Sequence, residues 1–315
     1  MTLTFNCGAL FGTSDREIIL LRTKPLVPRR ETLYNGEREK IRAFRRRRRE
    51  AERGFYQNMI ANYHTHTPRC GHAAGSEREY AEAALRAGLR TLGFSDHTPH
   101  DYFDCDYRTS GIRMELEELP GYADTVRALA AEYAGELEIL LGVEAEYYPK
   151  YFSRLLELLR GNGIRYMILG QHFVGNEVGE PYCGRPTEDR KTLERYVSQS
   201  IEAMDTGVFS FFAHPDLIRF VGDEGAYLRE MRRLCRAAAE RAMPLEINLL
   251  GIREGRNYPD ERFWRLAAEE GCTALIGCDA HRPEDLEDTR SEQRALDMAE
   301  RLGIRLIERA EPKNI

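Results

Sequence analysis

From residue 59 onward, hydrophobic positions fall into seven short runs separated by longer amphipathic stretches. The runs are MIANYH (59–64), TLGFSDH (91–97), EILLGVE (138–144), YMILGQH (166–172), VFSFFAH (208–214), PLEIN (244–248) and TALIGCD (273–279). Each run has the length of a buried strand, whereas the stretches between them are long enough for helices. This alternation predicts βα units and a mainly parallel sheet.

The stretches between the runs carry helix signals. After the first run, Ser76 and Glu79 form an S-x-x-E capping box, apolar residues follow at helical spacing, and Gly88 ends the helix. Further helices are predicted at 115–133, 149–160, 188–205, 224–241, 260–270 and 283–301. With 42% hydrophobic residues, the chain can bury one large α/β barrel domain or two ordinary domains.

Residues 1–58 differ from the remainder in composition. They carry 14 Lys and Arg against 7 Asp and Glu, a net charge of +7, whereas residues 59–315 carry 32 against 45, a net charge of −13. We expect this basic extension to be disordered or partly helical, and Met59 is an alternative start of the protein. The arginine run 45–49 could bind nucleic acid or act in targeting, or could simply be solvated. The acidic body does not suggest a broad nucleic-acid surface.

No stretch reaches the roughly 20 apolar residues needed to cross a bilayer, and the first thirty residues lack the features of a secretory signal. The seven cysteines are dispersed and include no CxxC pair, which argues against a disulfide framework and against a thiolate zinc site. We therefore expect a cytoplasmic protein that does not associate with membranes. The sequence gives no signal of an oligomeric state.

Polar residues that can bind metals stand at the ends of the hydrophobic runs. Six runs end with one each, namely His64, His97, Glu144, His172, His214 and Asp279. The remaining run, PLEIN, ends with Asn248 and contains Glu246 two residues earlier. In a parallel barrel the carboxyl ends of the strands form one face, where active sites are built. Residues distant in sequence are therefore expected to meet.

The number of candidate ligands predicts more than one ion. His64 and His66 are two residues apart, so on a strand they point to the same side and can hold one ion together. The full set of nine candidates is His64, His66, His72, His97, Glu144, His172, His214, Asp279 and His281. Nine ligands exceed the needs of a single ion, so two or three divalent ions (zinc, manganese or iron) are implied. Close ions that share a hydroxide favour hydrolysis of a phosphate ester, and Glu144 could bridge them.

Seven motifs, in order, resemble the polymerase-and-histidinol-phosphatase (PHP) superfamily, and within it the histidinol-phosphatase branch. They are HTHTPRCGH, GFSDH, GVEAEYY, GQHF, AHPDL, LEINLLGIR and GCDAHRP, between about Met59 and Arg301. The resemblance implies a distorted TIM-like (β/α)7 barrel over 59–315, a trinuclear centre at the carboxyl ends of the strands, and hydrolysis of L-histidinol phosphate by a metal-bridging hydroxide. One departure is RCGHAAG, where typical members carry FCPHG.

The resemblance also implies how the ligands divide among the ions. One ion would take His64, His66, Glu144 and Asp279; a second Glu144, His172 and His214; and a third His72, His97 and His281. Asp279 would also orient the nucleophile, so Asp279 and Glu144 are the expected catalytic residues.

Other polar residues near these motifs are candidates for supporting roles. Asp96 and Asp216 stand next to ligand motifs and could orient imidazoles or cap loops. Arg253 matches the position of an arginine that follows the corresponding EIN strand in the histidinol-phosphatase branch, and it is the first candidate for binding the phosphate. Arg113 and Arg185 lie in loops on the active face and could also bind phosphate. His100 is a candidate for a substrate contact, an outer contact to the metal centre, or loop packing.

Two alternatives to a histidinol-phosphatase stay open. A protein with the same metal centre could act on other small phosphate esters or nucleotides, as a phosphodiesterase or exonuclease. A nuclease is expected to show a basic groove with aromatic stacking positions, which the acidic body lacks. In the second alternative the barrel is structural and the basic extension binds nucleic acid. Nine converging ligands argue against that alternative.

Overall fold

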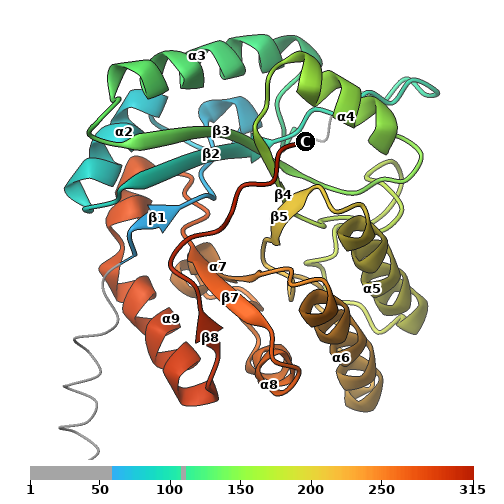
Figure 1. Ribbon diagram of the computed structural model, residues 1–315. Coiled ribbons are helices and arrows are strands. Elements are labelled where there is room, and N and C mark those ends of the chain that lie inside the picture. The colour runs from blue at the N-terminus through green and yellow to red at the C-terminus, as the bar shows by residue number, and fades with distance from the viewer. Residues whose placement is uncertain (1–58, 108–110) are drawn as a thin grey trace, which may run out of the picture. The chain divides into compact units, whose positions relative to one another are not determined.

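A parallel sheet curls around the centre of the computed structural model, which describes residues 59–107 and 111–315 (Figure 1). Its strands are β1 (Ala61–Asn62), β2 (Thr91–His97), β3 (Glu138–Ala145), β4 (Tyr166–Leu169), β5 (Phe209–Phe212), β6 (Leu245–Asn248), β7 (Thr273–Gly277) and β8 (Arg305–Leu306). They pair in chain order, each parallel to the next. The predicted α/β barrel with a parallel sheet is thus confirmed. The predictions for residues 1–58 lie outside the described residues.

Each hydrophobic run contains one strand, but the sheet has one strand more than the seven expected. The additional strand, β8, is only two residues long and pairs Arg305 and Leu306 with Thr273 and Ala274 of β7. Too short for a hydrophobic run of its own, it leaves no pattern in the sequence.

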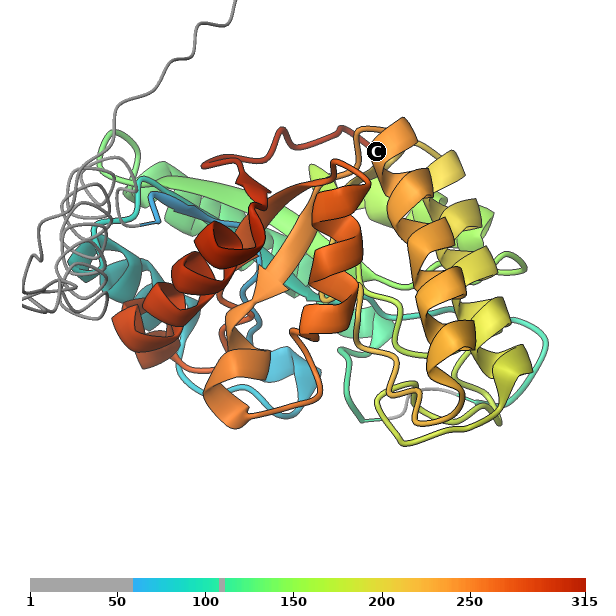
Figure 2. The same ribbon diagram turned by 90° about the horizontal axis from the view of Figure 1, so that it is seen from below.

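Helices cover the outside of the curled sheet (Figures 1 and 2). They are α2 (Glu77–Arg86), α3 (Leu119–Glu132), α4 (Phe152–Gly161), α5 (Arg190–Asp205), α6 (Glu224–Glu240), α7 (Leu249–Glu254), α8 (Glu261–Glu269) and α9 (Thr289–Leu302). Short 3-10 helices are η1 (Pro68–Cys70), η2 (Leu116–Glu118) and η3 (Pro283–Glu287). The capping box of Ser76 and Glu79 is present at the start of α2. Among the described residues, no helix combines the length and apolarity that a membrane span requires.

The helices of the structure differ from the prediction in three places. The helix expected at 115–133 begins as the 3-10 helix η2 and continues as α3. The helix expected at 283–301 is divided into η3 and α9, because the Asp288 side chain accepts a hydrogen bond from Ser291 N and begins a new helix there. The short helix α7 was not predicted. It begins directly at the end of β6, where the Asn248 side chain accepts from Gly251 N.

The interior of the curled sheet holds a small buried cluster in which Tyr166 packs with Tyr63, Ile168 and Phe211, and Tyr166 is fully buried. Its hydroxyl donates to the carbonyl of Tyr63 over 2.8 Å. A Cβ added at Gly93 in β2 or at Gly142 in β3 would overlap the Tyr166 side chain. Glycine at these positions therefore makes room for the tyrosine.

The two ends of the curled sheet differ. At the carboxyl end of the strands, Ala280 bonds to the chain after β1, with His66 N donating to Ala280 O over 2.9 Å and Ala280 N to His64 O over 3.2 Å. At the other end the segment after β8 crosses the sheet, and Ala310 packs beside Tyr63 and Tyr166 (Figures 1 and 2). The carboxyl end is left open to solvent above the polar cluster.

Candidate metal centre

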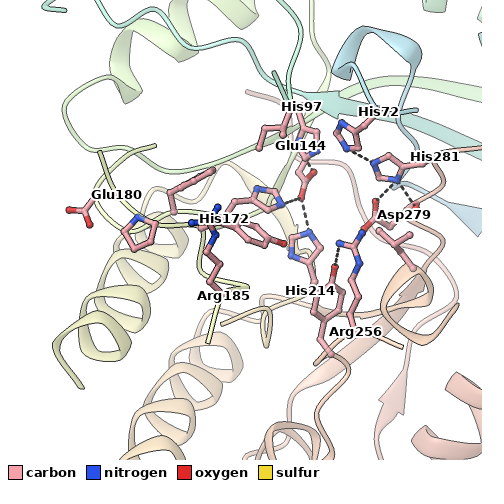
Figure 3. A pocket seen from close by; sticks show the side chains of 16 residues that line it. His72, His97, Glu144, His172, Glu180, Arg185, His214, Arg256, Asp279 and His281 are labelled. Carbon is pink, nitrogen blue, oxygen red and sulfur yellow. Dashed lines mark hydrogen bonds and ion pairs between the residues drawn. The ribbon is translucent and has the colours of Figure 1, made fainter. Parts of the chain in front are cut away.

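The predicted ligands converge at the carboxyl end of the sheet (Figure 3). Seven of the nine line one cavity of about 490 Å³, namely His72, His97, Glu144, His172, His214, Asp279 and His281. The other two, His64 and His66, are fully buried and contact Glu144 and Asp279. The structure thus brings together all nine side chains, which come from six strands or the loops after them.

Four ligand atoms surround a first candidate ion position. The Nε2 atoms of His64 and His66 lie 3.1 Å apart, and they lie 3.4 and 3.1 Å from Asp279 Oδ1. Their distances to Glu144 Oε2 are 3.5 and 3.6 Å. Tetrahedral ligation with bonds of about 2.1 Å separates the ligand atoms by about 3.4 Å. These atoms therefore fit a divalent transition-metal ion.

Glu144 also faces a second candidate position through its other oxygen. Oε1 lies 2.9 Å from His214 Nε2 and 3.5 Å from His172 Nε2. Among the described residues, neither buried oxygen of Glu144 has a hydrogen-bond partner, and the same holds for Asp279 Oδ1. Since buried carboxylate oxygens without partners are costly, cations between them and the imidazoles would satisfy them. Glu144 is placed to bridge two ions.

The three ligands predicted for a third ion, His72, His97 and His281, do not surround one position as clearly. His72 Nε2 and His281 Nε2 are 2.9 Å apart, whereas His97 Nδ1 approaches Glu144 Oε2 at 3.0 Å. The His97 ring is nearer to His66 than to His72, with centroid distances of 4.4 and 5.6 Å. His66, His97 and His281 also lie close enough to share an ion. The grouping of His97 with His72 and His281 stays a prediction.

Outer carboxylates fix the imidazole rings from behind. Glu246 Oε1 lies 2.8 Å from His64 Nδ1, Glu146 Oε1 lies 3.0 Å from His172 Nδ1, and Asp96 Oδ1 lies 3.4 Å from His66 Nδ1. A ring that donates through one nitrogen presents the other to an ion. Asp96 therefore occupies the orienting position expected of it. Neither Glu146 nor Glu246 was singled out from the sequence for such a role. The available signals were the position of Glu246 at the end of a run and that of Glu146 two residues after Glu144.

Asp216 does not hydrogen-bond to the ring of His214, whose Nδ1 has no partner among the described residues. Its Oδ2 accepts from the backbone N of Asp260 over 2.6 Å, so it connects two loops, in keeping with the alternative of a loop cap. Its carboxyl is buried, and burial raises its pKa to about 7.

Local backbone features place the ligands. A Cβ at Gly170 would overlap the carboxylate of Glu144, and one at Gly277 would overlap that of Glu246. His214 and Asp279 adopt φ angles of 34° and 46°, in the left-handed region that residues other than glycine seldom occupy. Such conformations concentrate at functional sites, where the surrounding structure enforces them.

The electrostatics of the cluster favour cations. Burial alone would raise the pKa of Glu144, but the imidazoles of His172, His97 and His64 outweigh it and hold that pKa well below its usual range. Burial lowers the pKa of His66, yet hydrogen bonds to Asp279 and Asp96 outweigh burial and raise it to about 9. The carboxylates are therefore ionised and attract positive charge into the site.

Comparison with known proteins decides the family. The profile of the PHP domain matches residues 62–249. The chain is a member of the PHP domain family. This PHP protein is 33% identical over 237 residues to a probable histidinol-phosphatase of Deinococcus radiodurans, covering 72% of this chain and 88% of the relative. It is 25% identical over 252 residues to the histidinol-phosphatase of Bacillus subtilis, covering 71% and 94%. It therefore belongs to the histidinol-phosphatase branch.

Solved structures agree with the fold of this PHP protein. Histidinol phosphate phosphatase from Lactococcus lactis, solved with zinc, L-histidinol and phosphate, superposes with a TM-score of 0.62 at 18% identity, covering 80% of this chain and 99% of that one. A structure from Listeria monocytogenes, named as that of a putative histidinol phosphatase, gives a TM-score of 0.62 at 19% identity, covering 74% of this chain and 99% of that one. At this identity the likeness concerns the fold alone.

Two of the predicted substrate contacts lie outside the metal cavity of the PHP protein. Arg113 is buried and its guanidinium is held by Glu146 and Glu177. His100 is also buried, with Nε2 lying 3.1 Å from Glu146 Oε2. These positions do not favour direct contact with a substrate, because carboxylates already occupy the donors. Of the roles considered for His100, an outer contact to the metal centre fits this position best.

Arg253 lies in an adjoining cavity of about 270 Å³, together with His72 and His281. Its Nε is 3.2 Å from Asp285 Oδ1 and its Nη1 is 3.5 Å from Asp288 Oδ2. Its expected contact with phosphate stays a prediction.

Two other arginines line the metal cavity itself (Figure 3). Arg185 is exposed, and its guanidinium has no hydrogen bond or ion pair within 59–107 and 111–315. Arg256 pairs with Glu254 at 2.7 Å and donates to the hydroxyl of Tyr258 over 3.0 Å. Arg256 was missed in the sequence, although it lies only three residues after Arg253.

Proposed function

We propose that this PHP protein is a metal-dependent phosphomonoesterase that hydrolyses L-histidinol phosphate to L-histidinol and phosphate, as a step of histidine biosynthesis in the cytoplasm. The observation that carries the proposal is the position of Glu144. Each of its oxygens faces its own set of imidazoles, at the floor of a solvent-open cavity. The names of the relatives from Deinococcus radiodurans and Bacillus subtilis support the substrate.

Two or three divalent ions, zinc, manganese or iron, would supply an activated water nucleophile and would neutralise the phosphate oxygens. The nine ligands would hold them as the resemblance implies, with Glu144 and Asp279 nearest to the reacting atoms. Zinc, L-histidinol and phosphate in the Lactococcus lactis structure support this chemistry.

The residues of the cavity wall would bind the substrate. Arg185 has donors available for the phosphate, and Arg256 can share its donors between Glu254 and the phosphate. The rings of Phe173, Tyr182 and Tyr258 line the same cavity and could pack against the alcohol part of the substrate.

The test is to purify the protein, measure its bound metals, and assay phosphate release from L-histidinol phosphate, from nucleotides and from a generic aryl phosphate. Selective release from L-histidinol phosphate is the expected result. Turnover of many esters without preference would replace the proposed substrate by a broader class. A metal-loaded protein without any turnover would contradict the proposal.

A further inference from the structure

The buried arginine Arg113 has every N–H of its guanidinium engaged. Nε and Nη2 donate to Glu177 Oε2 over 3.0 and 2.7 Å. Nη1 donates to Thr98 O and to Glu146 Oε2, both over 3.0 Å, and Nη2 also donates to Glu146 Oε1 over 2.9 Å. The contact with Glu146 is a two-pronged fork, a geometry that lysine cannot reproduce.

Glu146 connects Arg113 to the metal centre, because it contacts both Arg113 and His172. While its two oxygens accept from Arg113, Oε1 lies 3.0 Å from His172 Nδ1 and Oε2 lies 3.1 Å from His100 Nε2. The other nitrogen of the His172 ring, Nε2, faces Glu144 Oε1 at the second candidate ion position (Figure 3). A ring that donates through Nδ1 keeps the lone pair of Nε2 for an ion.

Three segments that follow different strands meet at this network. Arg113 and Thr98 come from the segment after β2, Glu146 directly follows β3, and His172 and Glu177 come from the segment after β4. The last segment also carries Arg185 of the cavity wall.

We propose that Arg113 is a positioning residue for the second ion: it holds Glu146 in the orientation that fixes the ring of His172. Removal of the guanidinium leaves the carboxylates of Glu146 and Glu177 buried without their shared cation. Breaking a buried ion pair from one side is costly, so the two carboxylates separate or admit water. Glu146 then no longer holds His172, and the ion bound through His172 is held less tightly.

The experiment measures zinc per chain in solutions of controlled free zinc, together with kcat and KM. Three variants are compared with the wild type: Arg113→Met, Glu146→Gln and Arg301→Met. The last is the matched control, because Arg301 forms the same two-pronged contact with Glu261 at the exposed surface.

Arg113→Met and Glu146→Gln are each expected to lower the affinity for one zinc ion by roughly 10- to 100-fold. We expect kcat to fall while KM changes little, because no substrate contact is removed. Arg301→Met is expected to match the wild type in zinc affinity, kcat and KM. The kinetic part rests on the proposed phosphatase function, whereas the zinc measurement does not, so the two can fail separately.

A higher KM in Arg113→Met, with unchanged zinc binding and kcat, would show a direct substrate contact and overturn the proposal. So would an Arg113→Met variant that folds and binds zinc as tightly as the wild type. If Arg113→Met does not fold, Glu146→Gln decides, because it keeps every heavy-atom position; wild-type zinc affinity in that variant would contradict the proposal.

Discussion

The carboxylate of Glu144 can stand between two groups of imidazoles because a glycine faces it. A Cβ at Gly170 would overlap this carboxylate, which has little room to move because it is buried among His64, His172 and His214. Glycine at position 170 is therefore required for Glu144 to occupy its place in the metal centre.

Gly170→Ala is expected to displace Glu144 and to reduce both bound metal and activity, by roughly the 10- to 100-fold seen when ligand support is lost. Metal analysis and kcat measure the effect. Gly121→Ala in α3 is the control, because a Cβ there meets no atom within 4 Å. Full metal content in Gly170→Ala would show that the Glu144 carboxylate is not confined.

Asp216 provides a test based on pH. Its pKa is raised to about 7 by burial, whereas an unfolded aspartate titrates near about 3.9. Between these values the folded protein retains a proton that the unfolded chain has released, so the contribution of Asp216 to stability falls as pH rises. Above about pH 7 the loss is complete.

Asp216→Asn removes this titration and keeps an oxygen that can accept from Asp260 N. The free energy of unfolding of the variant minus that of the wild type is therefore expected to be larger at pH 8 than at pH 5, because only the wild type loses stability as the pH rises. Denaturant titrations at both pH values measure it. An equal difference at the two pH values would contradict the prediction.

At the scale of elements, ligand positions could be predicted because each ligand that closes a hydrophobic run lies in its strand or at most three residues after it. His97, Glu144 and His172 needed only the rule that parallel strands open on one face. The burial of Arg113 could not be predicted, because it depends on how the segments after β2, β3 and β4 pack together. Likewise α7 follows its strand without a linker, and β8 is too short to leave a pattern.

Substitutions in the outer helices are expected to change the stability of the protein without changing the metal centre. Asp223 caps α6 by accepting from Ala226 N over 2.8 Å. Asp223→Ala is expected to lower the free energy of unfolding by about 0.5–2 kcal/mol, with kcat unchanged, whereas Asp223→Asn retains the cap. Denaturant titration beside the phosphatase assay checks both. A fall in kcat would connect α6 to the site.

For the whole molecule, the cluster of buried carboxylates and imidazoles joins stability to bound metal. The first position alone gathers side chains from the beginning, middle and end of the barrel, namely His64, Glu144 and Asp279. An ion held by all three binds only the folded chain. The sequence could predict this convergence, but not the register that sets the distances.

Removal of metals by a chelator is expected to abolish activity and to lower the free energy of unfolding. Each ion present at 100 times its Kd contributes about 2.7 kcal/mol. Adding back zinc or manganese should restore both quantities. Asp279→Asn is the control and should show a smaller metal-dependent gain. Equal stability with and without chelator would contradict a metal centre at this place.

The backbone at His214 and Asp279 has a consequence for engineering and for natural variation. Glycine would hold φ angles of 34° and 46° at a lower conformational cost than either residue. Substitution by glycine would relieve the backbone while removing an imidazole or a carboxylate from the centre. A selection for thermostable variants would therefore favour glycine at these two positions, although either substitution would reduce activity.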